Sequence, residues 1–237
     1  MDRPFHGAFV LTVIPRLLAY LPITLGLTLA TAALGLALGF VLARARLCGG
    51  RFAAGAARGF ITAMRCTPSI VLLFLVYYGL PALIHALTGQ DVNTAPRALF
   101  VILTLALLFA ASAGEMMRAA YLSVDKGQRE AALSAGLSEA RAFALVVFPQ
   151  AVRAAIGPLG NSLITLMKEG ALAYTIGMID MMGQGNLIIA RNYGSYALET
   201  YLALALIYWL LTALIERGFH ALEERLAQRH GGGAYAS

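Results

Sequence analysis

Charged residues are scarce in this chain of 237 residues: Asp, Glu, Lys and Arg make up 13% of it, against about 25% in an ordinary soluble domain. Hydrophobic residues make up 59%. This balance excludes an ordinary soluble domain and favours an integral membrane protein. The net charge of +6 comes from basic residues spread along the chain without a dense patch. Orientation in a membrane therefore explains the charge better than nucleic-acid binding does.

Lysine and cysteine are also rare. Neither Lys126 nor Lys168 follows a glycine, so the Gly-Lys-Ser/Thr of a phosphate-binding loop is missing. Cys48 and Cys66 lack metal-ligand spacing, and we expect both to be reduced packing residues. Zinc and GxSxG patterns are missing too. We therefore expect no enzymatic activity, no metal and no cofactor in this chain, so that its energy comes from a separate ATPase subunit or an ion gradient.

Apolar stretches recur along the chain, and the first has 27 uncharged residues between Arg16 and Arg44. We predict membrane spans at 17–43, 66–84, 98–117, 152–167 and 200–215. Between them the sequence predicts a basic loop at 44–65 broken by Gly49-Gly50, and a Gly- and Met-rich connection at 168–199. The second span is expected to end near Pro81. Pro15 is expected to break the short apolar run before Arg16. We expect no cleaved signal peptide in this N-terminal segment.

The fourth apolar stretch is weaker than the others. Arg153 and Pro158 interrupt it, and it carries Asn161, Ser162 and Thr165. Polar side chains at membrane depth avoid lipid, so this segment is predicted to line a protein interior or a water-filled path.

The positive-inside rule orients these five spans. With the N-terminus outside, 13 of the 18 basic residues lie on the inner face. The thirteen are Arg44, Arg46, Arg51, Arg58, Arg65, Arg118, Lys126, Arg129, Arg141, Arg153, Arg217, Arg225 and Arg229. The N-terminus is therefore predicted outside, and the C-terminus and residues 126–150 are predicted in the cytoplasm.

Residues 126–150 are polar and rich in small side chains, and they predict a helix-turn-helix. Asp125 is placed to cap the first helix, Glu130 to lie in its first turn, and Gly136 to end it in a left-handed conformation. Ser138 is placed to cap the second helix, which the next proline stops or kinks. From the residues alone, a solvated loop and a docking surface for another protein are equally good interpretations.

The order and spacing of particular residues in this segment indicate a specific protein family. Glu130-Ala131-Ala132, then Gly136 after three residues and Phe148-Pro149 after eleven more, resembles the EAA motif of ABC importer permeases. In that family the loop is a coupling helix that docks into a groove of the cytoplasmic ATPase. Further matches to the polar amino-acid permeases of the histidine, glutamine and arginine type extend over residues 21–226. They are Glu115-Met116-Met117-Arg118-Ala119, Lys126-Gly127-Gln128, Pro149-Gln150-Ala151, Pro158-Leu159-Gly160-Asn161 and Lys168-Glu169.

This resemblance implies an all-α integral membrane protein with about five transmembrane helices and a cytoplasmic coupling loop at about 119–150, the MetI-like ABC importer permease fold, in one domain over 1–237. It implies a multi-pass subunit of the bacterial inner membrane that imports polar amino acids or opine-like derivatives. The implied partners are ABC ATPase subunits that bind the ATP, a second permease subunit, identical or homologous, and a periplasmic substrate-binding protein.

The resemblance also assigns residues. It assigns ATPase coupling to Glu130, Ala131, Ala132, Gly136, Leu137 and Pro149. It assigns the substrate path to Glu115, Asn161, Ser162, Lys168 and Glu169. It implies that the Glu169 carboxylate meets a substrate amino group or cationic side chain while Asn161 or Ser162 bonds the substrate carboxylate. The chain departs from the family where Gly170-Ala171-Leu172 follows Lys168-Glu169 in place of Thr/Ser-Ser-Leu, and at Cys66 in Arg65-Cys66-Thr67-Pro68.

Three local alternatives stay open at this point. Glu115 and Arg118 share a helix face, either as an ion pair or as a charged lining of the path. Lys168 fits an interfacial anchor as well as a substrate contact. Met178, Met181 and Met182 fit adaptable packing or a soft-metal site. At the level of function, the alternatives are an ion-coupled secondary transporter and a membrane scaffold without transport.

Overall fold

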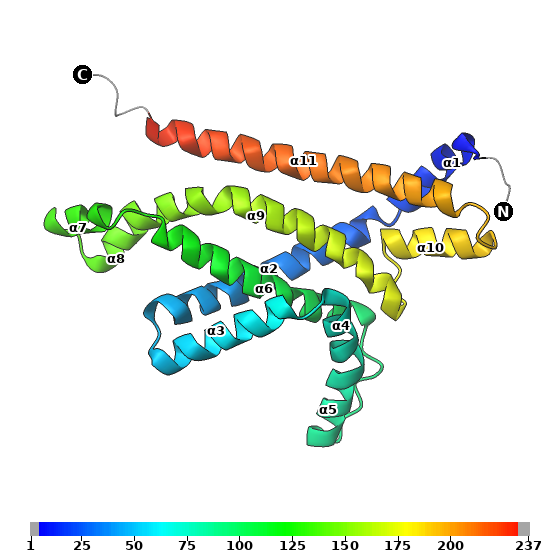
Figure 1. The fold of residues 1–237 in the computed structure, drawn as a ribbon, viewed down its shortest axis with the longest axis horizontal. Helices are drawn as coiled ribbons and strands as arrows, with labels where there is room; N and C mark the ends of the chain where they lie inside the picture. The colour runs from blue at the N-terminus through cyan, green and yellow to red at the C-terminus, as the bar shows by residue number, and fades with distance from the viewer. Residues whose placement is uncertain (1–4, 232–237) are drawn as a thin grey trace.

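The computed structural model describes residues 5–231, with side chains as far as Leu226. Regular structure in this range is helical (Figure 1). Five helical stretches in it are long and apolar enough to cross a membrane, which confirms the five predicted spans. They are Leu21–Cys48 (α2), Ser69–Thr88, Arg97–Leu122 (α6), Glu139–Ile176 and Ala197–Leu226, the last within α11 (Ala197–Gly231). The charged tail from Glu216 on also predicts a helix ending in Gly231-Gly232-Gly233, and Gly232 and Gly233 lie outside the described residues.

The N-terminal apolar run is a separate helix. Helix α1 spans Gly7–Leu18 and continues through Pro15, so the expectation that this proline breaks the run was wrong. A turn at Ala19 and Tyr20 separates it from α2, which begins at Leu21 with proline in its first turn. Helix α1 packs against α11 and against α10 (Met181–Arg191). The first membrane span therefore starts later and ends later than the uncharged stretch.

The predicted basic loop at 44–65 was also wrong, because most of it is helix. Gly49 ends α2 as the breaker predicts, but α3 follows at once over Arg51–Cys66. Alanine is a strong helix former and recurs in this segment. Ala57 and Ile61, four residues apart on one face, are buried while most of the other side chains are exposed. Helix α3 is therefore amphipathic and lies along α2 and α6 (Figure 1).

Proline does not end the second span, and it does not interrupt the fourth. The second span runs as α4 (Ser69–Phe74), a π-helical turn η1 (Leu75–Gly79) and α5 (Leu80–Thr88), so it continues past Pro81. The fourth runs as α8 (Glu139–Ala142), the π-helical turn η2 (Phe143–Val147), α9 (Phe148–Gly170) and the 3-10 turn η3 (Ala171–Ile176). Pro158 lies inside α9, which the sequence had predicted as an interrupted segment.

The connection predicted at 168–199 is largely helical too. After η3 the chain turns at Gly177 and forms α10, which packs on α1 and α11. Met181 is fully buried there among Val13, Leu17 and Leu204. Met178 packs against the larger core, which α4, α6, α9 and η3 share. Both methionines therefore pack as the packing interpretation predicts.

Helices α2 and α6 cross closely in the bundle. A Cβ added at Gly39 would lie 2.9 Å from the Ala113 Cβ and 3.0 Å from the Gly114 nitrogen. Small residues at such a crossing let two backbones approach closely, which is the main source of helix association in lipid. This contact places α6, whose far end leads to residues 126–150.

Substituting Gly39 by Val should destabilise the bundle, because the added atoms collide with the backbone of α6. Overpacking of this kind costs about 1–3 kcal/mol. Thermal unfolding of the detergent-solubilised protein, followed by circular dichroism, measures the loss. Gly26→Val on the same helix is the matched control, since nothing lies within 4 Å of its added Cβ. An equal loss in both variants would contradict the close crossing.

Asp180 caps α10 from a buried position between the fourth and fifth spans. Its Oδ1 accepts a hydrogen bond from the Gly183 nitrogen at 2.8 Å, and its Oδ2 has no partner among the described residues. The next residue, Met181, donates its backbone N–H to the Thr24 hydroxyl of α2 at 3.1 Å. Burial raises the pKa of the Asp180 carboxyl from 3.8 to about 6.

The charge of Asp180 therefore costs stability at neutral pH. Because the folded-state pKa lies above the unfolded value, the folded protein holds this proton more tightly, and stability falls as the pH rises through this interval to about 6. Asp180→Asn keeps a capping oxygen without the charge. It should be more stable than the wild type at pH 8, by at most about 3 kcal/mol, and the difference should shrink below pH 6. A difference independent of pH in thermal unfolding would contradict this.

Candidate functional site

The segment at one end of the bundle has the helix-turn-helix shape that the sequence predicts. Helix α7 spans Lys126–Ser134, and the Asp125 carboxylate caps it by accepting the Gly127 N–H at 2.6 Å. At its other end Gly136 has φ of +88°, the left-handed conformation that glycine adopts readily. The Gly136 and Leu137 nitrogens donate to the carbonyls of Leu133 and Ala132. This pair of backbone hydrogen bonds is a Schellman cap, so the helix end is sharply defined.

Two local predictions in this segment were wrong. Helix α7 begins at Lys126, directly after the predicted cap, so Glu130 is its fifth residue and lies beyond the first turn. Ser138 does precede α8, but its side chain makes no capping hydrogen bond. The turn is instead held by an ion pair between Arg129 and Glu139, with 2.6 Å between the guanidinium and the carboxylate.

One face of α7 is buried and the other is available to a partner. Ala132 packs inward against η2, while Glu130, Ala131 and Ala135 are exposed. Leu137 is half-buried at the turn. The short exposed side chains of Ala131 and Ala135 therefore let another protein approach the backbone closely beside Glu130.

Pro149 lies in the first turn of α9, directly after the π-helical turn η2. Proline lacks the N–H that an α-helix needs at this position, and a π-helical turn takes up the resulting change in hydrogen bonding. The second helix of the segment is therefore continuous with the fourth span.

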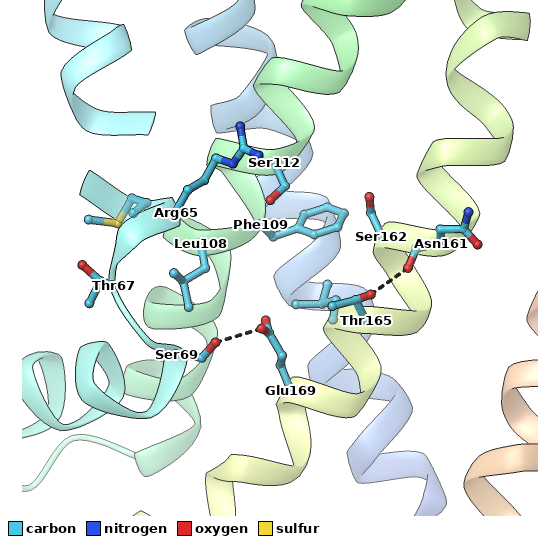
Figure 2. A pocket seen from close by; sticks show the side chains of 12 residues that line it. Arg65, Thr67, Ser69, Leu108, Phe109, Ser112, Asn161, Ser162, Thr165 and Glu169 are labelled. Atoms are coloured by element: carbon cyan, nitrogen blue, oxygen red, sulfur yellow. Dashed lines mark hydrogen bonds between the residues drawn. The ribbon is translucent and has the colours of Figure 1, made fainter. Parts of the chain in front are cut away.

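A cavity of about 390 Å³ lies between α3, α4, α6 and α9 (Figure 2). It brings together three of the predicted substrate-path residues, Asn161, Ser162 and Glu169, all of them from α9. The opposing wall comes from the end of α3, the start of α4 and the middle of α6. The full lining is Met64, Arg65, Thr67, Ser69, Leu108, Phe109, Ser112, Asn161, Ser162, Thr165, Leu166 and Glu169.

The cavity has one side chain of each charge. Glu169 is half-buried, and its Oε1 accepts a hydrogen bond from the Ser69 hydroxyl at 2.8 Å. Arg65 projects from the last turn of α3 (Figure 2). A carboxylate and a guanidinium within one cavity match a ligand that has both a cationic and an anionic group, because charge-assisted hydrogen bonds are the strongest that side chains make.

Glu115 and Lys168 do not line this cavity. Glu115 is bonded to two cations: its Oε1 accepts from the Arg118 guanidinium at 2.5 Å, and its Oε2 pairs with Arg46 of α2. The ion-pair interpretation of Glu115 and Arg118 is therefore confirmed, with a second arginine added. Lys168 is exposed on α9. A role of either residue in the substrate path stays a prediction.

Sequence reasoning missed Arg65, Ser69 and Ser112 as members of the site. The signal for Arg65 was the Arg65-Cys66-Thr67-Pro68 motif, which was noted without a role. Nothing local marks Ser69 or Ser112, because only the packing of α4 and α6 around α9 brings them to the cavity.

Residues 35–228 match the family described as "binding-protein-dependent transport system inner membrane component". The chain belongs to this family. It is therefore a permease component of a transport system and a multi-pass membrane protein.

Curated relatives cover nearly the whole permease. The L-cystine transport system permease protein TcyL of Bacillus subtilis is 38% identical over 226 residues, which covers 95% of this chain and 93% of the relative. The glutamine transport system permease protein GlnP of Escherichia coli is 33% identical over 222 residues, covering 94% and 98%. The nopaline transport system permease protein NocM of Agrobacterium fabrum is 33% identical over 205 residues, covering 86% and 84%.

Solved structures share the permease fold. A chain of an amino acid ABC transporter crystallised with histidines superposes with a TM-score of 0.81 at 28% identity, covering 94% of this permease and all of that chain. A chain of the inward-facing MetNI methionine ABC transporter superposes with a TM-score of 0.66 at 20% identity, covering 89% and 95%. The predicted all-α fold of the methionine-importer type is thus confirmed.

Glu115→Gln should destabilise the permease, because it leaves Arg46 and Arg118 close together without their shared anion. For a partly buried group we expect a loss of about 1–2 kcal/mol, between the values for exposed and buried pairs. Thermal unfolding in detergent measures it. Glu139→Gln is the matched control: it breaks an exposed ion pair and should change the midpoint little. No difference between the two variants would contradict a structural role for the Glu115 ion pairs.

Proposed function

We propose that this permease imports polar amino acids across a bacterial inner membrane, as the transmembrane subunit of an ABC importer whose ATP is bound by separate ATPase subunits. Relatives whose names specify cystine, glutamine and nopaline transport support the substrate class. The observation that carries the proposal is the cavity with Glu169 and Arg65 on different walls, because every amino acid has an ammonium and a carboxylate to be matched.

The orientation follows from the basic residues. The N-terminus lies in the periplasm, and the C-terminus and α7 lie in the cytoplasm, which puts 13 of the 18 basic residues inside. An ATPase can reach α7 on that side, and a periplasmic binding protein can deliver substrate on the other. The coupling loop at about 119–150 is part of one permease domain that comprises residues 1–237.

In the substrate path, the Glu169 carboxylate receives the substrate ammonium and Arg65 receives its carboxylate. Asn161 and Ser162 add hydrogen bonds from the same wall as Glu169. Since Ser69 already donates to Glu169, an arriving ammonium joins an existing polar contact at the start of α4. Glu115 lies further toward the α7 end of α6 and acts on the path through the position of that helix.

Coupling is mechanical in this account. Helix α7 follows α6 after a short turn, and a second turn at Gly136 joins it to α8, which is continuous through η2 with α9. Helices α6 and α9 hold most of the cavity lining. Glu130, Ala131, Ala132, Gly136 and Leu137 form the docking turn, and Pro149 marks where it joins α9. When two ATPases close on ATP, α7 moves with them, and the cavity opens outward; hydrolysis resets it.

A second permease subunit completes the path. Five spans make a small bundle, and large apolar side chains remain exposed on several of them. We place the path near a two-fold or pseudo-two-fold axis between two subunits, as closed symmetric assemblies require. The partner is either an identical copy or a homologue.

Gly136→Asp should uncouple ATP hydrolysis from uptake while the spans stay folded. The new anion lies at the negative end of the α7 dipole and on the docking turn, so it weakens the cap and the contact together. Gly136→Asn is the control, because asparagine tolerates the left-handed conformation without the charge. Proteoliposomes containing the permease, its ATPases and its binding protein report amino acid taken up per ATP hydrolysed. Full uptake by Gly136→Asp would contradict this role, and absence of ATP-driven uptake by the wild type would contradict the proposed function.

A further inference from the structure

A second cavity, of about 580 Å³, lies at the opposite end of the bundle from α7. Its walls are the first residues of α6, Arg97 and Ala98, the polar residues just before them, the turn at Gly177, and Tyr77 of η1. Ala98 lies ten residues before Leu108 on α6, so this outer cavity is about 15 Å along the helix from the first cavity.

Arg97 is the one charged side chain that lines the outer cavity. Its NH1 donates to the Gly177 carbonyl at 2.9 Å, and the rest of the guanidinium has no partner among the described residues. The nearest acid along the chain, Asp91, accepts hydrogen bonds from the Asn93 backbone and side chain at 2.8 and 2.7 Å and does not line the cavity. The cavity therefore has a positive field with unused N–H donors.

The Gly177 carbonyl is a replaceable partner for Arg97. Gly177 donates its own N–H to Tyr174, and Met178 donates to Ala173, so the backbone holds this turn without Arg97. A guanidinium binds a carboxylate through two parallel charge-assisted hydrogen bonds, which are stronger than one bond to a neutral carbonyl. An arriving carboxylate can therefore take Arg97 from Gly177 and leave the turn folded.

The turn at Gly177 also connects the two cavities. It follows η3, which continues from α9 directly after Glu169 and Gly170. Tyr77 lines the outer cavity and packs edge-on against Phe100, with 5.4 Å between ring centroids, while Ser69, at the start of the same span, reaches Glu169. Both α9 with η3 and the second span therefore run from one cavity to the other.

We propose that the outer cavity is an entry site that binds the carboxylate of an arriving amino acid through Arg97, in exchange for the Gly177 carbonyl. The inference rests on the proposed function for the direction of transport and for the substrate class. Arg97 then acts as the first recognition point, and its release from Gly177 frees the turn that leads to Glu169.

The experiment places a reporter thiol in the cavity. Ala98→Cys is introduced with Cys48→Ala and Cys66→Ala, and the permease with its ATPases is reconstituted in phosphatidylcholine vesicles. Membrane-impermeant methanethiosulfonates, one with a sulfonate and one with a trimethylammonium group, label the thiol from outside. Arg97→Gln should lower the ratio of sulfonate to trimethylammonium labelling rates on the order of fivefold. Arg191→Gln, an exposed arginine outside both cavities, is the matched control and should not change the ratio.

Protection from labelling identifies the ligand. L-glutamine, L-arginine and L-cystine are tested beside their α-amides, which lack the carboxylate. At least one amino acid should slow sulfonate labelling, its amide should not, and Arg97→Gln should abolish the protection. Equal protection by acid and amide, an unchanged ratio in Arg97→Gln, or a thiol that no reagent reaches would each overturn the proposal. The proposal would also be overturned if sulfonate labelling slowed in vesicles of anionic phosphatidylglycerol without any added amino acid. That result would mean that Arg97 binds lipid phosphate.

The two proposals fail separately. ATP-driven uptake by the wild-type proteoliposomes decides the proposed function without reference to Arg97. If the wild type transports an amino acid that gives no protection at Ala98→Cys, the entry site is wrong and the transport function stands. If protection and the charge ratio behave as expected but no ATP-driven uptake occurs, the carboxylate site stands and the importer function is wrong.

Discussion

The crossing of α2 and α6 at Gly39 and Gly114 is the contact on which the rest of the bundle depends. In lipid, helices associate through close packing and hydrogen bonds, since burial in the bundle removes no apolar surface from water. The small residues of this crossing bring α6 against α2, and the ion pair between Glu115 of α6 and Arg46 of α2 joins the same two helices near one end. Helix α6 in turn supplies the wall that faces α9 across the first cavity, and its last turn leads to α7.

Two prolines show how this chain combines long helices with hinge-like turns. Pro81 and Pro149 each lie in the first turn of an α-helical segment that directly follows a π-helical turn, η1 or η2. The π-helical turn absorbs the missing N–H, so the span continues where a sequence rule predicts a stop. One of these turns, η2, joins α8 to α9, and the other, η1, carries Tyr77 beside the outer cavity.

Local sequence determined much of the helix-turn-helix structure of residues 126–150. Asp125 and Gly136 act through their own backbone neighbourhood, so their capping roles were predictable from type and position. Helix α3 was not predicted, because its charge obscured an amphipathic face that only α2 and α6 cover. The first cavity was half predictable, because the polar residues Asn161, Ser162 and Glu169 of α9 show in the sequence. Arg65 and Ser69 of that cavity, and Arg97 of the outer cavity, were not predictable, because helices distant in sequence complete both sites.

The most direct test of the account asks which protein binds α7. The tagged permease is purified in mild detergent from its native host, and bound proteins are identified by mass spectrometry, beside a Glu130→Lys variant of equal yield and helicity. The account predicts that an ABC-type ATPase co-purifies with the wild type and is lost or strongly reduced in the variant. If no ATPase accompanies the folded wild type, the coupling role of α7 is contradicted.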